Sequence, residues 1–435
     1  MRFKYCLYIR SLALFLICMA AGCGGNSENS GVTNSGVITN STLVRDSNPQ
    51  VSDADLAAVV EGNTDFALKA FSLLDPKNGT NTVFSPYSIT QALALAAAGA
   101  KGTTLSGIEK ALSFVLPQDH QNPAFNRLDL LLAANTSSAD QAYAGNLPQL
   151  KIVNALWAQE GFPLLPAYLD TIALNYGAGP HLLDFIHAAE DSRITINSWV
   201  EGQTNSRIKD LVSRDSITSD TRLVLTNAIW FKAEWASRFL PENTHDQTFI
   251  GRDGLPSNVA FMHKKLTLPY AQGYGSQAFD IPYMDGKLSM LVLMPEPGTF
   301  DAFLSTLTSA RLRDITNLLA DQYISIALPK FTFSSGPDMG TALKTLGMSD
   351  AFDPSKADFS GIDGLRDLSI GAVVHKAFIG VGEDGTEAAA ATAIVLSTSG
   401  SLTSSLPLTV DHPFIFLIRD RQTGLIFFMG KVVSL

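Results

Sequence analysis

Apolar residues recur at helical spacing in two stretches of the first quarter of the chain. From Asp53 to Leu74 the apolar positions share one helix face, and Ser52 or Asp53 stands before them as a candidate N-cap. Ser88 to Ala98 is so rich in alanine and leucine that it predicts a helix buried on all sides. The first half of the chain is therefore predicted to be mainly helical.

Long apolar runs with few charges predict strands that are covered on both faces of a sheet. These runs are 150–158 and 221–231. Two further apolar runs, 370–381 and 413–418, also predict strands. Residues 287–294, after the Asp285-Gly286 turn, predict a hairpin strand, and 338–346 a short helix. Because strands dominate the second half, the pattern predicts a mixed α+β fold built around a large central sheet.

An unusually long connection, Gly382 to Ser405, separates the predicted strands 370–381 and 413–418. Loops of this length are uncommon inside compact domains and are usually functional or disordered. Four alanines at 388–391 argue against disorder at its start, because small apolar side chains can be buried without steric cost. In a strand, one inward face would hold the alternating residues Thr386, Ala388, Ala390 and Thr392. The loop is therefore predicted to be able to join a sheet.

The N-terminus has the pattern of an exported bacterial lipoprotein. Basic residues precede an apolar core, Leu12 to Ala21, that is too short to span a bilayer permanently, and small residues stand directly before Cys23. We expect residues 1–22 to be a signal peptide and Cys23 to anchor the protein by lipid to the cell envelope; the alternative is an ordinary signal peptide cleaved nearby. Residues 23–51 are predicted to be a flexible tether and 52–435 a single domain.

Composition and charge narrow the possible functions. With 46% apolar and 17% charged residues the chain can build one large core. Its net charge of −10 argues against nucleic acid and other polyanions, which need a basic patch. Cys6 and Cys18 would leave with the signal and Cys23 would carry the lipid, so we expect no disulfide and no cysteine nucleophile in the domain.

Motifs for enzymatic chemistry are weak. Gly380 to Gly385 fits G-x-G-x-x-G, but Glu383 and Asp384 lie where a pyrophosphate would approach, and no further βα unit follows. The chain has neither a G-x-S-x-G elbow nor an H-E-x-x-H helix. The histidines are scattered without an i, i+4 pair: His120, His181, His187, His245, His263, His375 and His412. We expect no enzyme, metal site or cofactor; an exported enzyme assembled from distant residues is the weakest of three hypotheses.

Several segments resemble the serpin family, in that family's order. E-D-G-T-E-A-A-A-A-T at Glu383 to Thr392 is similar to the hinge of inhibitory serpins, and Asp411 to Val432 resembles the C-terminal signature. Further similar segments are Asn81 to Ile89, Gly99 to Thr104, Ile196 to Val200, Thr221 to Lys232 and Leu328 to Phe331. The resemblance covers residues 55–435. It implies a large central sheet with additional sheets, about eight or nine helices and a mobile reactive loop.

The resemblance also implies roles for particular residues. The hinge would be Glu383, Asp384, Gly385, Thr386, Glu387, Ala388, Ala389, Ala390, Ala391 and Thr392. The shutter, a buried polar cluster where the sheet must part, would be Ser85, Ser88, Asn227 and His375, and the breach at the top of the sheet would contain Trp235. Taken alone, His375 in its apolar strand is an ordinary core histidine and Trp235 an ordinary core aromatic. A polar cluster with two satisfied arrangements can hold a sheet closed yet let it re-form around a new strand.

The function implied is suicide inhibition of a serine protease, with cysteine proteases as a second class of partner. The family's spacing places the reactive bond between Ser399 and Gly400, with Leu396 or Leu402 as alternative acyl-side residues. Residues 396–402 contain no Arg or Lys, which disfavours a trypsin-like target. Small residues there favour an elastase-like enzyme, then a subtilisin-like one, then a chymotrypsin-like one.

The main competing hypothesis is a monomeric serpin-fold protein that binds or carries a ligand without inhibiting. Such proteins tend to have bulky or charged residues at inward hinge positions, which this hinge lacks. Some serpins bind heparin through a basic helix, but the corresponding segment, Gln121 to Ser137, offers only Arg127. We therefore expect a monomeric inhibitor without heparin activation.

Overall fold

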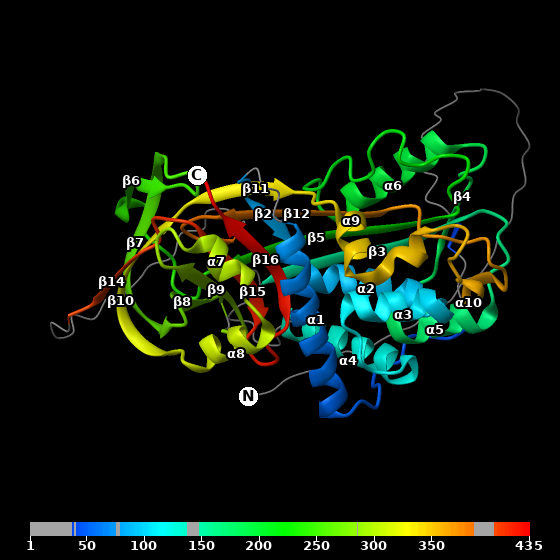
Figure 1. The fold of residues 1–435 in the computed structure, drawn as a ribbon, viewed down its shortest axis with the longest axis horizontal. Helices are drawn as coiled ribbons and strands as arrows, with labels where there is room; N and C mark the ends of the chain where they lie inside the picture. Colours follow the sequence, from blue (N-terminus) through cyan, green and yellow to red (C-terminus); the bar gives the residue numbers. More distant parts are fainter. Residues whose placement is uncertain (1–36, 39–40, 75–78, 137–147, 285, 387–403) are drawn as a thin grey trace, which may run out of the picture. The chain divides into compact units, whose positions relative to one another are not determined.

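The computed structural model describes residues 37–38, 41–74, 79–136, 148–284, 286–386 and 404–435 (Figure 1). Contacts join the described residues from 37 onward into one unit. The α helices are α1 Asp53–Leu73, α2 Pro86–Ala97, α3 Gly102–Leu112, α4 Gln118–Thr136, α5 Pro166–Tyr176, α6 Ala189–Gln203, α7 Phe300–Ser305, α8 Ser309–Asn317, α9 Met339–Leu343 and α10 Ser360–Asp363. The strands are β1 Val37–Ile38, β2 Thr82–Phe84, β3 Gln149–Gln159, β4 His181–Leu183, β5 Leu223–Glu234, β6 Thr244–Ile250, β7 Pro256–Gly273, β8 Ser276–Pro282, β9 Leu288–Pro295, β10 Ala320–Pro329, β11 Phe331–Ser335, β12 Val373–Val381, β13 Gly385–Thr386, β14 Leu406–Thr409, β15 Phe414–Asp420 and β16 Ile426–Val432.

The predicted helices α1 and α2 begin at serine caps. The Ser52 hydroxyl accepts from the Asp55 N–H at 3.1 Å, and the Ser85 hydroxyl accepts from the Ser88 N–H at 3.2 Å. Every residue of α2 is buried, as its alanine-rich sequence predicts. The described residues hold ten α helices, of which α7, α9 and α10 have six residues or fewer, so the count agrees with the about eight or nine helices that the resemblance implies. None of the helices described is both long and apolar enough to cross a membrane.

Three of the four strands predicted from apolar runs, β3, β5 and β12, lie in a seven-stranded sheet with the order β1-β4-β3-β5-β13-β12-β11. The fourth run, 413–418, forms β15 of the second sheet. β3 and β5 are antiparallel, whereas β5 and β12 are parallel from Leu225 opposite Val373 to Ile229 opposite Ala377. Figure 1 shows α2 on one side of β3 and β5 and α6 on the other. Val200 of α6 belongs to the same buried apolar cluster as Val153 and Ala228 of these strands. Because both faces are covered, the strands carry few charged residues.

The second sheet has nine strands, eight of them in the order β14-β10-β7-β8-β9-β15-β16-β2, with β6 paired to β7. β8 and β9 form the hairpin predicted around the Asp285-Gly286 turn, although Asp285 itself lies outside the described residues. β15 and β16 contain the segments predicted to carry the C-terminal signature, and α1 packs against β16.

The segment before α1 corrects one expected boundary. The sequence predicted a flexible tether up to residue 51, whereas several described residues of this stretch are bound to the domain. Val37 and Ile38 form β1, which pairs with β4. The Asp46 N–H donates to the Leu174 carbonyl at 2.9 Å, and Arg45 forms an ion pair with Asp129 at 2.7 Å. The partners of Arg45 and Asp46 lie on α4 and α5, far away in sequence. The composition around Arg45 and Asp46 therefore does not reveal these contacts.

Candidate functional site

The chain reverses direction at the start of the predicted hinge. The Gly382 N–H donates to the Gly385 carbonyl at 2.9 Å and the Gly385 N–H donates to the Gly382 carbonyl at 3.2 Å, closing a tight turn around Glu383 and Asp384. Gly385 has a φ of 155°, and a Cβ there would lie 2.0 Å from the Ala233 carbonyl oxygen. Only glycine therefore fits this position without a shift of the backbone.

The last residue of this turn, Gly385, and the residue after it, Thr386, form β13 and lie inside the central sheet. β13 is antiparallel to both neighbours, with Thr386 opposite Ala233 of β5 and Val381 of β12. Thr386 is 1% exposed, and its hydroxyl lies 2.6 Å from the Tyr283 hydroxyl. The side chain thus faces the core, as the alternation predicted, and β13 separates β5 from β12 at this end of the sheet.

Trp235 is hydrogen-bonded to this turn through both its side chain and its backbone. Its indole N–H donates to the Gly382 carbonyl at 2.9 Å, and its backbone N–H donates to the Asp384 carbonyl at 2.8 Å. The ring is fully buried and stacks on Tyr283 with 4.7 Å between ring centroids. The tryptophan therefore links the turn to the residue that contacts Thr386.

Charged side chains hold the turn from outside. Lys330 lies 2.8 Å from one Glu383 carboxylate oxygen and 2.9 Å from the other, and the Thr244 hydroxyl donates to Glu383 at 3.0 Å. Partial burial alone would raise the pKa of Glu383, but the hydrogen bonds from Lys330 and Thr244 outweigh it and the pKa is lowered. Arg238 lies 3.5 Å from the Asp384 carboxylate and also contacts Glu234. Both hinge acids are thus paired with cationic side chains.

The four predicted shutter residues lie together about halfway along the sheet. His375 on β12 accepts the Ser85 N–H through Nε2 at 3.1 Å, and its Nδ1 faces the Asn227 side-chain oxygen. Asn227 on β5 donates to the Ser88 hydroxyl. Burial lowers the pKa of His375 to about 3, so the ring is neutral with its proton on Nδ1. This cluster joins β5 to β12 where the two strands still pair directly.

Sequence reasoning missed two further members of the polar cluster. Asn154 on β3 accepts from the Asn227 amide and donates to the Gln91 side-chain oxygen at 3.4 Å. Asn154 is the only polar residue in the stretch 152–158, and Gln91 stands within the alanine-rich helix. An isolated amide in an apolar run is the signal that would have identified both, because a buried amide requires partners.

Comparison with known proteins identifies the fold. The family model described as Serpin (serine protease inhibitor) matches residues 61–435. The chain belongs to the serpin family. It is 36% identical over 430 residues to an uncharacterized serpin-like protein of Thermococcus kodakarensis, covering 97% of this chain and 98% of that one. It is 37% identical over 382 residues to leukocyte elastase inhibitor A of Mus musculus, covering 86% of this chain and 98% of the inhibitor. The crystal structure of the thermophilic serpin tengpin in its native state matches with a TM-score of 0.78 at 28% identity, covering 92% of this chain and 98% of tengpin.

Part of the predicted serpin site lies outside the described residues. These positions are the later hinge residues Glu387 to Thr392, the reactive-bond candidates Leu396, Ser399, Gly400 and Leu402, and the lipidation candidate Cys23. The described part holds the beginning of the hinge, the breach and the shutter. In that part, no group of three or more His, Cys, Asp or Glu side chains is placed to hold a metal ion.

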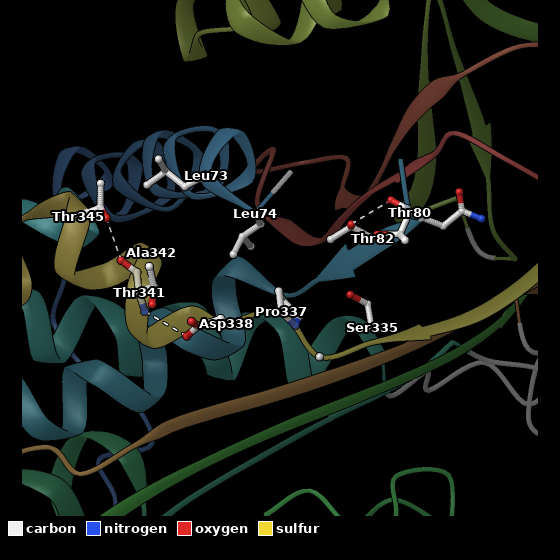
Figure 2. A pocket seen from close by; sticks show the side chains of 12 residues that line it. Leu73, Leu74, Thr80, Thr82, Ser335, Pro337, Asp338, Thr341, Ala342 and Thr345 are labelled. Atoms are coloured by element: carbon white, nitrogen blue, oxygen red, sulfur yellow. Dashed lines mark hydrogen bonds between the residues drawn. The ribbon is translucent and has the colours of Figure 1, made fainter. Parts of the chain in front are cut away.

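A pocket of about 380 Å³ lies apart from the hinge of this serpin, between the end of α1, β2 and α9 (Figure 2). Its lining combines apolar side chains, such as Leu73 and Leu74, with the hydroxyls of threonine residues. Asp338, on its rim, caps α9 by accepting the Thr341 N–H at 3.1 Å. The pocket shares no residue with the hinge, breach or shutter.

Proposed function

We propose that this serpin is a suicide inhibitor of serine proteases that traps its target by inserting the cleaved reactive loop into the central sheet. The observation that carries the proposal is β13: Gly385 and Thr386 already occupy the space between β5 and β12. The family relationship to leukocyte elastase inhibitor A supports the same activity. No bulky or charged residue stands at an inward hinge position to stop the strand from growing.

The sheet offers a gain in hydrogen bonding when the strand extends. β5 and β12 are parallel where they pair directly, and parallel ladders are slightly less stable per residue than antiparallel ones. A strand that continued from β13 would be antiparallel to both neighbours, as β13 already is. Insertion therefore replaces one parallel ladder by two antiparallel ones, which is a source of free energy for moving the protease.

The existing register predicts where the growing strand would lie. Thr386 is opposite Ala233 and Val381, and each later residue of the loop would meet the preceding residue of both neighbouring strands. Thr392 would then come between Asn227 and His375, which already face one another across the shutter. A small hydroxyl-bearing side chain at this position can replace the hydrogen bonds that the two strands lose on parting.

The chemistry needs the protease's serine and the loop's scissile bond. The protease's serine oxygen would bond to the carbonyl carbon of Ser399, and the amine of Gly400 would leave with residues 400–435. Insertion before water attacks the ester would then leave the enzyme covalently held. The small residues around this bond favour an elastase-like target, followed by subtilisin-like and chymotrypsin-like enzymes.

The deciding experiment incubates the purified domain with elastase-like, subtilisin-like, chymotrypsin-like and trypsin-like proteases and separates the products on denaturing gels. We expect a band at the summed mass with at least one of the first three. Sequencing the released C-terminal fragment identifies the bond as Ser399–Gly400 or as one following Leu396 or Leu402. Cleavage by every protease without any covalent band would favour the non-inhibitory alternative.

We also propose that the inhibitor is exported and held to the cell envelope by a lipid on Cys23, because small residues and an apolar segment precede that cysteine. Feeding cells a labelled fatty acid should label the protein, and Cys23→Ser should abolish the label and release the domain from membranes. Labelling that survives Cys23→Ser would overturn this assignment.

A further inference from the structure

Arg45 and its neighbours form one of the attachments between the segment before α1 and the domain, in addition to the pairing of β1 with β4. The Arg45 Nη2 lies 2.7 Å from the Asp129 carboxylate, and its Nε donates to the Asn126 side-chain oxygen at 2.8 Å. Asn126, which is completely buried, returns a hydrogen bond to the Asp46 carbonyl at 2.8 Å. Both α4 side chains are therefore oriented by the segment that precedes α1.

Gln91 on α2 connects this attachment to the interior. Its amide Nε2 donates to the Asp129 carboxylate at 3.3 Å and to the Tyr87 hydroxyl at 2.7 Å, and its oxygen accepts from Asn154 at 3.4 Å. Gln91 is 8% exposed. Because a carboxylate can only accept, Asp129 determines which end of the Gln91 amide faces it, and hence which end faces Asn154.

The same logic continues through the central sheet. Asn154 presents its oxygen to the Asn227 amide, so Asn227 presents its own oxygen to the His375 Nδ1. His375 then carries its proton on Nδ1 and leaves Nε2 free to accept the Ser85 N–H. The contacts form one continuous path, here called the polar relay: Arg45, Asp129, Gln91, Asn154, Asn227 and His375.

We propose that Arg45 is a positioning residue for the shutter: through Asp129 and Gln91 it holds Asn154, Asn227 and His375 in the arrangement that keeps β5 and β12 together. The ionic end of the relay lies on the segment before α1, and its neutral end lies where the strands must part. Changing Arg45 therefore changes how readily the sheet opens. The consequence for inhibition rests on the proposed function, whereas the effect on sheet opening does not.

The charge at the outer end of the polar relay predicts that removing Arg45 makes β5 and β12 separate more readily. Asp129 is partly exposed, with a side-chain exposure of 32%, and Arg45 is the cation that faces it. Without the guanidinium the carboxylate gains freedom to turn to solvent, and Gln91 loses the acceptor that sets its orientation. The shutter amides then sample alternative hydrogen bonds, and the strands separate more often.

The test measures amide hydrogen exchange of the intact protein at residues 225–229 and 373–377, where β5 and β12 pair directly. Arg45→Met should accelerate exchange there by roughly three- to tenfold and leave β15 unchanged. Arg45→Lys, which keeps the charge but not the second hydrogen bond, should restore part of the protection. Arg127→Met is the matched control, because it removes a guanidinium from α4, the helix that carries Asp129, without removing a member of the polar relay.

A double-mutant cycle separates a relay from two independent effects. Gln91→Leu should accelerate exchange at the same amides, and Arg45→Met added to Gln91→Leu should cause no further change. Additive effects, wild-type exchange in Arg45→Met, or equal acceleration in β15 and in the shutter strands would each overturn the proposal.

A second measurement keeps this result distinct from the proposed function. If wild type forms a covalent complex, Arg45→Met should change its rate of formation and Arg127→Met should not. If no protease is trapped by wild type, suicide inhibition fails as a function, while the exchange data still accept or reject the relay.

Discussion

The breach and the shutter hold the same two strands by opposite means. At the breach, β5 and β12 are already separated by β13, and the turn is held by ion pairs of Glu383 and Asp384 with side chains near the surface. At the shutter the strands still pair, and the cluster is buried and neutral, with His375 3% exposed. For the insertion proposed above, the difference predicts that the strand starts to enter where solvent can reorganise charges and is limited where buried amides must exchange partners.

The largest effect is expected from blocking the strand at its first buried side chain. Thr386→Arg would place a cation against Tyr283 in a site that is 1% exposed, so the cleaved loop cannot insert and the protease escapes. Denaturing gels should show cleaved serpin but no covalent complex. Glu387→Arg is the matched control, because strand alternation directs this neighbour to the opposite face, and it should still form complex. Equal complex formation by both variants would refute insertion as the trapping step.

The next largest effect is expected from changing the turn between Gly382 and Gly385. Gly385→Ala should cost about 1–3 kcal/mol of unfolding free energy, because the backbone must shift or adopt a strained φ. The added Cβ would lie 2.0 Å from the Ala233 oxygen, whereas a Cβ at Gly382 would meet no described atom within 4 Å. Gly382→Ala is therefore the control, and urea unfolding should show it close to wild type.

The neutral shutter should make stability depend on pH. The pKa of His375 is lowered by burial from 6.5 to about 3, so the stability that the neutral ring contributes is complete above pH 6.5 and is lost as the pH falls toward 3. At pH 5 the loss should be about 2 kcal/mol, from about 1.4 kcal/mol for each unit between pH 6.5 and 5. His375→Gln should flatten this part of the curve. His120, whose pKa is raised by its hydrogen bond to Asp55, has the opposite sign, so His120→Gln should not flatten it.

The smallest effect is expected at the surface of the breach. Lys330→Met removes the ion pair with Glu383. The Lys330 side chain is 40% exposed and that of Glu383 18%, so solvent screening limits the loss of unfolding free energy to about 0.5–1 kcal/mol. The difference from wild type should shrink in high salt. A loss of several kcal/mol that is insensitive to salt would mean that the breach, like the shutter, depends on buried polar contacts.

The sequence predicted the site best where local pattern and role coincide. The alternation from Thr386 onward predicted an inward side chain, and Thr386 is buried. The apolar runs around Asn227 and His375 predicted strands, and these strands pair with the two residues opposite one another. It failed to identify the partners of Arg45 and Gln91. The isolated amide of Gln91 in an alanine-rich helix indicates that it needs a partner, but Asp129, which contacts both residues, is distant in sequence, so no local pattern names it.

The amino-acid order by itself determined the elements, the covered central strands, the serpin motifs and the small residues of the hinge, because each depends on spacing within one segment. Only the tertiary structure decided that Gly385 and Thr386 already separate β5 from β12, that Lys330 and Arg238 pair with the hinge acids, and that the segment before α1 is bound to α4. These contacts join segments that are far apart in the sequence, such as Lys330 with Glu383 and Arg45 with Asp129. Their geometry is set by how the sheets and helices pack, and no local pattern records it.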